Sequence, residues 1–486
     1  MDLWHEERLL IDGELVAAEG GRTFETTNPA TGEVLGTAAD ATIADADRAI
    51  AAARRAFDET DWSTDKELRL RCIRQLHQAL VKERESLRPL LVAEVGAPLM
   101  LTEGPQLDTP IDITEWYADL LERYEFTEEL GEIESRGQQH RRWVEKEAVG
   151  VVAAIAPYNF PVQIILAKLV PALAAGCTVV VKGPPQTPWV NASLGRLIAE
   201  HTDIPAGVVS VLNSSEVEVS KLLVTDPRVD MVSFTGSTAA GRHIMAAASD
   251  TVKKVFLELG GKSAFIVLDD YDLELAAMFA GFTVCAHSGQ GCAITTRVLV
   301  PRAKLDQAVE LLAGTMSGVP VGDPSDPGNL MGPLITEEQR QKVDALVKEA
   351  VADGAKVVVG GAPVDGPGFF YQPTLLVDVD QDARIAQEEV FGPVLVVIPY
   401  DDDDDAVAIA NNSIFGLSGS VWGADEERAI GVARRIRVGT VSVNGGMYYG
   451  PDAPFGGYKQ SGIGREMGVA GLEEYLEGKT LAIPVT

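Results

Sequence analysis

Apolar runs and amphipathic segments alternate regularly along residues 151–259 of the chain. The apolar runs are short, and we expect them to form strands at Val151–Ala156, Thr178–Lys182, Val208–Leu212, Asp230–Phe234 and Val255–Leu259. The segments between them are expected to form helices at Val162–Ala175, Trp189–His201, Val217–Thr225 and Ala239–Ala248. Strands and helices in this rhythm predict a parallel sheet with buried strands and helices packed on its faces.

The segments before this region carry shorter signals. Two strand-like runs, Leu9–Ile11 and Glu14–Val16, flank Asp12-Gly13, which predicts a hairpin. Thr42 is placed to cap a following helix. A long helical region is expected from Lys66 to Tyr124.

A second α/β region is expected from about Gly260 to Lys459. Within it, Thr336 and Gln339 have the spacing of a capping box at the start of a helix. The acidic run Asp401–Asp405 precedes a helix expected at Ala406–Asn411, where negative charge favours the helix N-terminus. No internal repeat indicates a solenoid.

Composition narrows the class of protein. The 486 residues are 46% hydrophobic and 23% charged, which is typical of a globular chain large enough for more than one core. Against 41 Lys and Arg stand 72 Asp and Glu, a net charge of −31. Such a field repels nucleic-acid phosphate and anionic membranes, so neither is an expected partner.

Localisation and metal content follow from a few segments. Residues 1–7 lack the basic start and apolar core of a signal peptide, and the most apolar stretch, 148–167, is broken by two prolines. The four cysteines and six histidines show no disulfide framework and no zinc-ligand spacing. We therefore expect a cytoplasmic protein without a metal site.

One cysteine and one glutamate have an unusual setting. In Gly289-Gln290-Gly291-Cys292 the glycines allow a tight turn that exposes the thiol, as a nucleophile requires, although a lone cysteine is often a small buried hydrophobe. Glu258 stands at the end of an apolar strand, where it is either a satisfied structural acid or a general base. A hydrolase pair of Cys292 with His287 is a further hypothesis for the thiol.

Two polar turns follow predicted strands, at the edge where α/β sheets bind ligands. In Pro157–Pro161, Asn159 either caps the next helix or offers its amide to a developing oxyanion. In Phe234–Thr238, Ser237 either caps a helix or helps its N-terminus to bind phosphate. The strands are not followed by a Gly-x-Gly-x-x-Gly fingerprint, and Gly261-Lys262-Ser263 lacks the first glycine of a phosphate-binding loop.

Together these motifs resemble the aldehyde dehydrogenase superfamily over residues 9–477. The resemblance rests on an ordered set of segments: Pro157–Pro161, Val181-Lys182, Phe234–Ser237, Glu258–Lys262, Gly289–Cys292, Glu388–Pro393 and Pro454–Gly457. It implies a Rossmann-like cofactor domain (1–128 and 149–258) and an α/β catalytic domain with the nucleophilic cysteine (259–460). It also implies a small projecting β element for oligomerisation (129–148 and 470–486), and hence a homodimer or homotetramer.

The resemblance implies oxidation of an aldehyde to a carboxylic acid. Cys292 would attack the aldehyde, and the Asn159 amide and the Cys292 N–H would hold the oxyanion. Glu258 would activate water to hydrolyse the thioester, which favours release of a free acid over transfer to coenzyme A. Lys168 either tunes the base or is a buried amine paired with a carboxylate.

The implied cofactor is NAD, with NADP possible. The residues that the resemblance assigns to it are Ile155, Ala156, Pro157, Tyr158, Lys182, Gly236, Ser237, Leu259, Gly260, Gln339, Glu389 and Phe391. Two departures weaken the inference at the adenosine end. Pro185 stands where many NAD-preferring relatives carry glutamate, and Asn213-Ser214-Ser215 lacks the glycines often found there.

The substrate is the least determined feature. The expected tunnel positions are Phe160, Gln163, Ile164, 284–288, Ile294, 447–449 and Phe455. Most are apolar and none is Lys or Arg, which favours a medium-sized hydrophobic aldehyde (aliphatic, terpenoid or aromatic) over a semialdehyde acid. Two competing hypotheses for the whole chain are a non-catalytic protein on the same fold and a cysteine esterase that uses Cys292.

Overall fold

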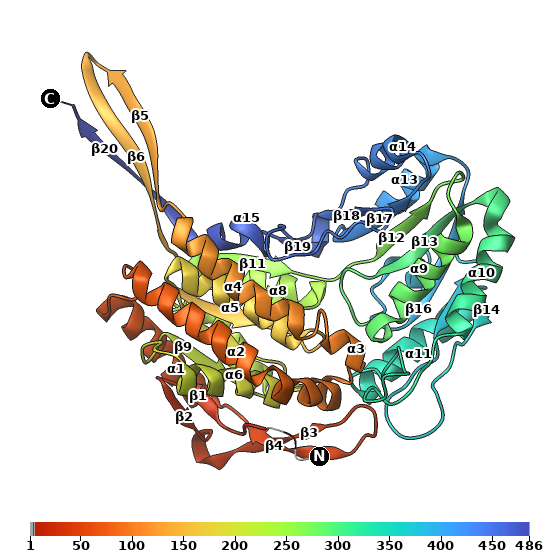
Figure 1. Cartoon of the computed structure of the whole chain (residues 1–486), viewed down its shortest axis with the longest axis horizontal. Helices are drawn as coiled ribbons and strands as arrows, with labels where there is room; N and C mark the ends of the chain where they lie inside the picture. Colours follow the sequence, from red (N-terminus) through yellow and green to blue (C-terminus); the bar gives the residue numbers. More distant parts are fainter. Residues whose placement is uncertain (1–2, 4, 486) are drawn as a thin grey trace.

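Two parallel sheets, each covered by helices, and a narrow three-stranded arm make up the chain (Figure 1). The computed structural model describes residues 3 and 5–485. Residues 1–2 and 4, on which the argument about a leader partly rests, and residue 486 of the predicted oligomerisation element lie outside them. The predicted α/β class with two lobes is confirmed. Within the described residues, no helix combines the length and the apolarity needed to cross a bilayer.

The first lobe is built on an eight-stranded sheet in the order β19-β11-β10-β7-β8-β9-β1-β2. Its strands are β1 (Leu9–Ile11), β2 (Glu14–Val16), β7 (Val151–Ile155), β8 (Thr178–Lys182), β9 (Val209–Leu212), β10 (Met231–Thr235), β11 (Lys254–Glu258) and β19 (Gly462–Ile463). Strands β7 to β11 run parallel, and β1, β2 and β19 are antiparallel additions at the edges. The five strands predicted over 151–259 and the N-terminal hairpin are all confirmed to within one residue.

Helices cover both faces of this sheet. They are α1 (Ile43–Glu59), α2 (Lys66–Val95), α3 (Leu99–Thr102), α4 (Asp108–Arg123), α5 (Pro161–Ala175), α6 (Pro188–His201), α7 (Val217–Thr225) and α8 (Thr238–Ala248), with short turns η1 (Glu19–Gly21) and η2 (Ser249–Thr251). Alternate side chains of β7 point to opposite faces: Val152 packs with α2, α4, α5 and α6, and Val151 with α1, α7 and α8.

Two local predictions for this lobe can be compared with the structure. Thr42 caps α1 as predicted, and Asp45 completes a capping box by accepting a hydrogen bond from the Thr42 N–H at 2.8 Å. The helical region predicted from Lys66 to Tyr124 consists of three helices. It is interrupted because Gly96 ends α2 in a left-handed conformation, with φ of 71°, and Pro98 follows.

The second lobe contains a seven-stranded sheet in the order β14-β15-β16-β13-β12-β17-β18, parallel except for β14. Its strands are β12 (Ser263–Val267), β13 (Thr295–Pro301), β14 (Lys356–Val359), β15 (Thr374–Val377), β16 (Val394–Tyr400), β17 (Ser418–Trp422) and β18 (Thr440–Val443). Its helices and short turns are α9 (Leu273–Cys285), η3 (Ala286–Gly289), η4 (Arg302–Lys304), α10 (Leu305–Ser317), α11 (Glu337–Ala352), α12 (Arg384–Gln387), α13 (Asp403–Asn411), α14 (Glu426–Ala433) and η5 (Lys459–Ser461).

Two predicted helix starts in the second lobe differ from the structure. Thr336 accepts a hydrogen bond from the Gln339 N–H, but the Gln339 amide donates elsewhere, so the capping box is only half formed. The acidic run does not simply precede its helix. Asp402 is the N-cap of α13, and Asp403–Asp405 lie in its first turn. Their negative charges interact favourably with the positive end of the helix dipole.

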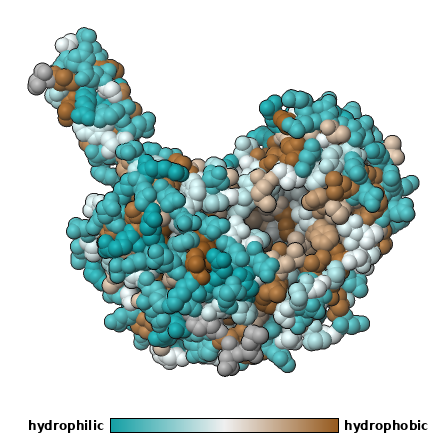
Figure 2. All heavy atoms as spheres, viewed as in Figure 1, coloured by the Kyte–Doolittle hydropathy of each residue, from teal (hydrophilic) through white to brown (hydrophobic). Residues whose placement is uncertain are grey.

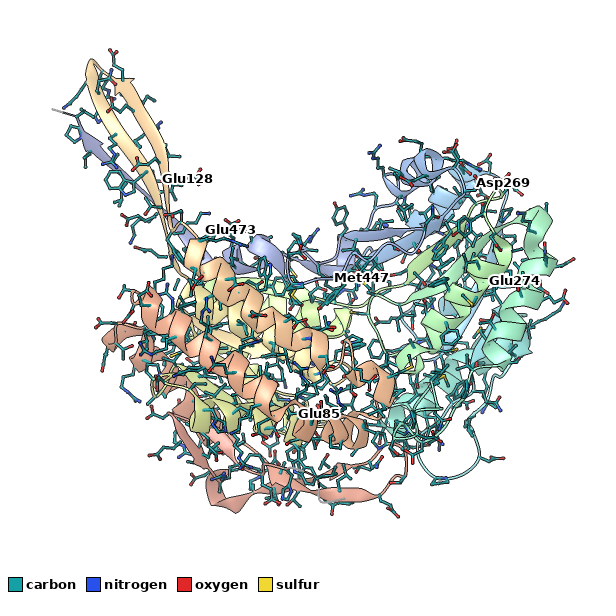
Figure 3. The ribbon with its side chains drawn as sticks, in the orientation of Figure 1. Glu85, Glu128, Asp269, Glu274, Met447 and Glu473 are labelled. Atoms are coloured by element: carbon teal, nitrogen blue, oxygen red, sulfur yellow. The ribbon has the colours of Figure 1, made fainter. Side chains whose placement is uncertain are left out.

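The arm is a three-stranded antiparallel sheet of β5 (Thr127–Ser135), β6 (Gln138–Ala148) and β20 (Leu476–Pro484). It projects away from the first lobe, and every residue of β5 is exposed (Figure 1). At its base, Lys146 forms an ion pair at 2.6 Å with Glu473, at the end of the preceding helix α15 (Gly468–Glu473) (Figure 3). A separate pair of strands, β3 (Thr23–Thr27) and β4 (Val34–Ala39), lies near the N-terminus.

The segment around β19 fastens the two lobes together at the end of β11. β19 pairs with β11 so that Gly462 lies opposite Glu258. Just before it, Ser461 Oγ donates to the Gly260 carbonyl at 2.7 Å and accepts from the Gly416 N–H of the second lobe at 2.9 Å. The backbone that carries Glu258 is therefore fixed by contacts to both lobes.

We expect Gly462→Ala to destabilise this junction. Gly462 has φ of 145°, and a β-carbon there would lie 2.1 Å from the Leu257 carbonyl oxygen, so β19 would have to leave the sheet. The free energy of unfolding should fall by roughly 2 kcal/mol or more, measured as a lower Tm by calorimetry. The control is Gly431→Ala in α14, where nothing lies within 4 Å of the added carbon. An unchanged Tm for Gly462→Ala would contradict this account of the junction.

Candidate active site

A cavity of about 190 Å³ opens at the carboxyl ends of the central strands of the first sheet. From β7 the chain continues to β8 and β9 on one side of the sheet and then crosses to β10 on the other side. The carboxyl ends of the neighbouring strands β7 and β10 therefore form the topological switch point, where α/β sheets bind ligands. The cavity is lined by Pro157, Tyr158, Asn159, Thr235, Gly236, Ser237, Leu259, Gly260, Cys292, Gln339, Lys342, Glu389 and Phe391.

The lining contains most of the residues singled out in the sequence and two that were missed. Thr235 and Lys342 are the additions. Lys342 lies three residues after Gln339 on α11, a spacing that places both side chains on one face of the helix. From this spacing the sequence could have indicated Lys342 once Gln339 was singled out. Five predicted residues do not line the cavity, namely Ile155, Ala156, Lys168, Lys182 and Glu258.

Cys292 follows a strained turn. His287, Ser288 and Gly289 have φ of 48°, 55° and 71°, so three successive residues are left-handed. Glycine is required at 289, because a β-carbon there would lie 2.1 Å from the Gly392 carbonyl oxygen. Cys292 is partly exposed, while the other three cysteines are buried. The turn therefore presents this thiol alone to the cavity.

Glu258 lies at the end of β11 and is 1% exposed. Neither of its carboxylate oxygens has a hydrogen-bond partner among the described residues. Burial raises the pKa of Glu258 well above its usual value, and the charge of Glu466 adds to this, while Lys168 and Arg465 oppose it. The carboxyl group is therefore not satisfied as a structural acid would be, and its use as a general base stays a prediction.

Lys168 of α5 is paired with a carboxylate. Its Nζ lies 2.6 Å from Glu466 Oε1, both side chains are buried, and it also lies over the Phe256 ring. Lys168 is therefore a buried amine paired with a carboxylate, which is one of its two predicted roles. Its influence on Glu258, through the opposing charges of Lys168 and Glu466, stays a prediction.

The Asn159 side chain, placed by the loop after β7, does not cap α5. The N-cap is Phe160, and no side chain bonds the first turn. Asn159 Nδ2 instead donates to the Gln290 carbonyl at 3.0 Å, within the turn that presents Cys292. The cap interpretation is thus wrong, and the amide lies beside the cysteine.

His287 is not arranged as a base for Cys292. Its Nε2 lies 3.4 Å from Gln106 Nε2, and its ring packs on Phe160. Burial lowers the pKa of His287 to about 4, with the Asn159 carbonyl acting in the opposite direction. Among the described residues no hydrogen bond joins the imidazole to the thiol, so the hydrolase pair gains no support.

The wall opposite Cys292 carries polar groups suited to a dinucleotide. Ser237 is exposed and caps α8, whose N-terminus faces the switch point. Thr235 Oγ1 is buried and has no hydrogen-bond partner in the described part of the chain. Glu389 accepts a hydrogen bond from the Gly261 N–H at 3.0 Å, and burial raises the pKa of Glu389 to about 7, opposed by that bond and by Lys342. These groups fit a phosphate and ribose hydroxyls.

Gln339 lines the cavity, and its contact with the cofactor stays a prediction. Its amide donates to the Val390 and Phe391 carbonyls at 3.1 and 2.9 Å, and Phe391 has φ of 57°. Gln339 therefore braces the strained turn that holds Phe391 against the cavity, and its amide nitrogen is already engaged.

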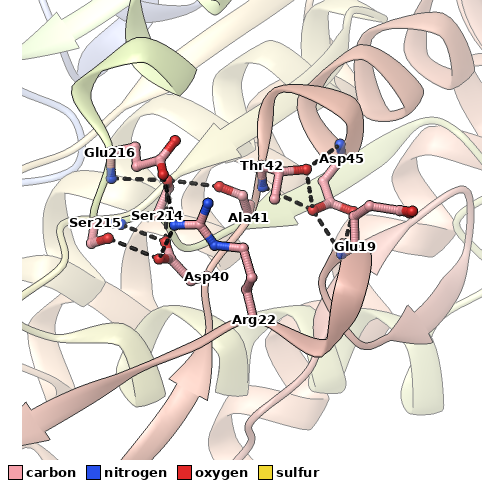
Figure 4. Close-up of polar contacts among 9 residues, drawn as sticks. All are labelled: Glu19, Arg22, Asp40, Ala41, Thr42, Asp45, Ser214, Ser215 and Glu216. Carbon is pink, nitrogen blue, oxygen red and sulfur yellow. Dashed lines mark hydrogen bonds and ion pairs between the residues drawn. The ribbon is translucent and has the colours of Figure 1, made fainter.

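Beyond the cavity, Lys182 ends β8 next to the end of β7. Burial lowers the pKa of Lys182 to about 8, and the charge of Asp40 opposes this shift. Asp40 accepts hydrogen bonds from Ser215 N and Oγ, both at 2.9 Å, and pairs with Arg22 (Figure 4). The loop that lacks the expected glycines is thus held by a carboxylate 175 residues away in sequence, a contact that no sequence signal indicates.

Within the described residues, no three His, Cys, Asp or Glu side chains are grouped as metal ligands.

Comparison with known proteins agrees with this geometry. The family model described as "Aldehyde dehydrogenase family" matches residues 15–481. A 3-succinoylsemialdehyde-pyridine dehydrogenase from Pseudomonas sp is 42% identical over 477 residues, 97% of either chain. The structure of betaine aldehyde dehydrogenase from Staphylococcus aureus with NAD+ matches with a TM-score of 0.94 at 36% identity, over 98% of this chain and 95% of that one. A mutant of Aldehyde Dehydrogenase C from Pseudomonas syringae with NAD+ and octanal matches with a TM-score of 0.93 at 39% identity, over 99% and 98% of the two chains.

The Cys292 thiol is expected to respond to the charge of Glu258. Burial raises the pKa of Cys292 well above its usual value, and Glu258 and Glu389 add to this, so alkylation by iodoacetamide should be slow at neutral pH and accelerate as pH rises. Glu258→Gln removes one negative charge, which lowers the pKa of the thiol. Alkylation should then be faster by roughly tenfold at alkaline pH, where Glu258 is ionised in the wild type.

Mass spectrometry of the peptide containing Cys292 measures this rate across pH. The control is Glu274→Gln, which removes an exposed charge of α9 (Figure 3). Superimposable pH profiles for Glu258→Gln and the wild type would contradict the electrostatic coupling.

Proposed function

The chain belongs to the aldehyde dehydrogenase family, and from this premise we propose that it oxidises a medium-sized, hydrophobic aldehyde to the carboxylic acid with NAD. The observation that carries the proposal is the meeting of Cys292 and the Asn159 amide in one cavity with a dinucleotide-like wall. The buried Glu258 carboxylate has no hydrogen-bond partner over residues 3 and 5–485, and its charge acts on Cys292.

Cys292 acts as the nucleophile in this proposal. Its thiolate forms a C–S bond to the aldehyde carbon, and the carbonyl electron pair moves to oxygen. The free N–H of the Asn159 amide and the backbone N–H of Cys292 hold that oxyanion. NAD, when bound, supplies the acceptor for the hydride that this carbon loses, and a thioester on Cys292 remains.

Glu258 completes the reaction as a general base. It takes a proton from water while the water oxygen attacks the thioester carbon, the C–S bond breaks, and the acid leaves. The raised pKa of Glu258 suits this task, because a base must hold a proton in one step and release it in another near neutral pH. Lys168 and Glu466 act through Glu258 as a positioning pair.

The wall of the cavity supports a dinucleotide, and NAD is favoured over NADP. The N-terminus of α8 with Ser237 would hold the pyrophosphate, Glu389 and Lys342 the nicotinamide ribose, and Lys182 the adenosine ribose. Ile155–Tyr158, Leu259–Gly260, Gln339 and Phe391 would form the walls of the nicotinamide site. Relatives of known structure were crystallised with NAD+.

Aromatic groups around Cys292 support a hydrophobic substrate. Tyr448 and Tyr449 are partly buried and pack with Cys292 against the same hydrophobic cluster. Burial raises the pKa of each tyrosine, and the charge of a Cys292 thiolate adds to this. Phe455 packs edge-on against Tyr449. At the surface, Met447 is 89% exposed between the two lobes, where apolar residues line a hollow (Figures 2 and 3).

The relatives differ in what their names say of substrates. One was crystallised with octanal, which agrees with a hydrophobic aldehyde, while another is named for a semialdehyde. A semialdehyde acid is therefore the second candidate. It is disfavoured because none of the expected tunnel positions is Lys or Arg, so a second carboxylate there would lose its hydration without gaining a cationic partner.

The two lobes and the arm would have different functions. The cofactor domain would comprise 1–128 and 149–258, the catalytic domain 259–460, and the oligomerisation element 129–148 and 470–486. The arm carries free edges at β5 and β20, together with exposed apolar side chains such as Leu130 and Ile133. Exposed edges of this kind are usually covered, which supports a homodimer or homotetramer.

Octanal and benzaldehyde are expected to be oxidised with NAD, and succinic semialdehyde much more slowly. NADH absorbance at equal concentrations of these aldehydes measures the rates, and NADP in place of NAD gives the cofactor preference. Cys292→Ala should abolish turnover, while the matched control Cys285→Ala, which removes a buried thiol of α9, should retain it. Faster oxidation of the semialdehyde would overturn the substrate class, and no turnover of any aldehyde would overturn the function.

Glu258→Gln is expected to separate the two halves of the reaction. Because the amide cannot take a proton from water, the variant should produce a burst of NADH close to one equivalent and then release acid slowly, by about 10² to 10⁴-fold. Stopped-flow absorbance gives the burst and steady-state assays give the release. An unchanged steady-state rate would show that Glu258 is not the base.

A further inference from the structure

Two buried glutamines hold Asn159 from opposite ends. Gln106, in the loop between α3 and α4, donates from Nε2 to the Asn159 carbonyl at 2.7 Å. The Gln290 carbonyl accepts from Asn159 Nδ2 at 3.0 Å. We propose that Gln106 and Gln290 are positioning residues that aim the free N–H of the Asn159 amide at the oxyanion. The inference rests on the proposed role of Asn159.

Gln106 fixes the peptide group next to the Asn159 side chain. The first hydrogen bond of α5 runs from the Ile164 N–H to the Phe160 carbonyl, so the helix supplies no partner for the Asn159 carbonyl. A buried carbonyl without a partner is costly, and Gln106, which is itself fully buried, provides one. The backbone from which the amide extends is therefore held by a side chain 53 residues away.

Gln290 fixes the other side. Its side chain donates to the His287 and Pro333 carbonyls, both at 3.2 Å, and accepts from the Ile335 N–H at 3.0 Å. These bonds close the left-handed turn, whose backbone is intrinsically unfavourable for His287 and for Ser288. The same residue thus sets both the carbonyl that orients the Asn159 amide and the position of the Cys292 N–H two residues later.

His287 completes the frame without taking part in proton transfer. Its ring lies against Gln106 and Phe160, and its pKa near 4 keeps it uncharged at neutral pH. Gln106 Nε2 donates to His287 Nε2 at 3.4 Å, so the ring holds the Gln106 amide by a hydrogen bond. The amide–oxyanion geometry depends in this way on residues that touch neither substrate nor cofactor.

The expected consequence is a slower acylation of Cys292. Complete loss of an oxyanion donor costs about 10² to 10³-fold in rate. Gln106→Met removes the donor to the Asn159 carbonyl while keeping the volume, so the amide should lose its aim, and acylation should slow by about tenfold or more. Gln290→Glu keeps the acceptor for Ile335 but removes both donors, and should slow the same step.

A burst with p-nitrophenyl acetate tests the proposal without aldehyde or NAD. Acylation of Cys292 releases nitrophenolate from the ester, and the oxyanion forms at the same place. The measurement is a double-mutant cycle of Gln106→Met with Asn159→Ala. If Gln106 acts through the Asn159 amide, its substitution should slow the burst in the wild type and have little further effect when Asn159 is alanine.

The control is Thr102→Val on α3. It removes the hydrogen bond that Thr102 donates to the Leu99 carbonyl at 2.6 Å and the one that it accepts from Arg88 at 3.2 Å, and neither bond involves Asn159. This variant should lower Tm and leave the burst rate unchanged. If Gln106→Met fails to fold, Gln106→Glu takes its place, since it has the same shape and presents an acceptor to the carbonyl.

The outcomes separate this proposal from the proposed function. Additive losses in the cycle, an unaffected burst in Gln106→Met, or no ester burst in the wild type would each overturn it. A protein that shows the coupled burst but oxidises no aldehyde would overturn the proposed function and leave the positioning roles of Gln106 and Gln290 supported.

Discussion

The close approach of the two lobes at Gly260 and Gly261 governs the geometry of the site. A β-carbon on Gly260 would lie 2.4 Å from Glu389 Oε2, and one on Gly261 would lie 2.5 Å from the Cys292 carbonyl oxygen. Because glycine has no β-carbon, the Glu389 carboxylate and the Cys292 carbonyl can both approach the linker this closely. β11 ends at Glu258 and β12 begins at Ser263, so this short linker joins the two sheets. The carboxylate, the cysteine and the dinucleotide-like wall meet because the linker carries almost no bulk.

The close approach of the two lobes also places acidic side chains near Cys292. Glu258, Glu389 and Glu466 all raise the pKa of Cys292, and burial does so more strongly still. Burial and these charges therefore favour the protonated thiol over the thiolate. The net charge of −31 makes binding of an anionic cofactor depend on local donors. The proposed function assigns this role to Lys182, Lys342 and the N-terminus of α8.

The sequence could predict those parts of the site that lie on one element or at the end of one strand. The parallel strands, the turn before Cys292 and the polar residues after β7 and β10 follow from periodicity and from the geometry of α/β sheets. The contacts of Asp40 with Ser215 and of Gln106 with Asn159 join segments 175 and 53 residues apart, and no local pattern encodes them.

Two predicted roles failed for reasons of backbone geometry. Asn159 does not cap α5, because Phe160 occupies the N-cap and the Asn159 amide is directed to Gln290 instead. The Gln339 side chain is drawn away from its capping box, because the left-handed turn at Phe391 leaves two carbonyls that need donors. In both cases a side chain with a common local use is recruited by an unpaired backbone group from a distant segment.

These recruited contacts explain how the site depends on the relation of the two lobes. Asn159 and Glu258 belong to the first lobe. Gln290 and Cys292 belong to the second lobe, where they lie just before β13. The bond from Asn159 to Gln290, the bond from Gly261 to Glu389 and the two bonds of Ser461 all cross the junction. A shift of one lobe against the other would break several of them together, so the junction holds Cys292, the Asn159 amide and Glu258 in a single arrangement. Precision at Cys292 is therefore a property of the junction rather than of the cysteine loop alone.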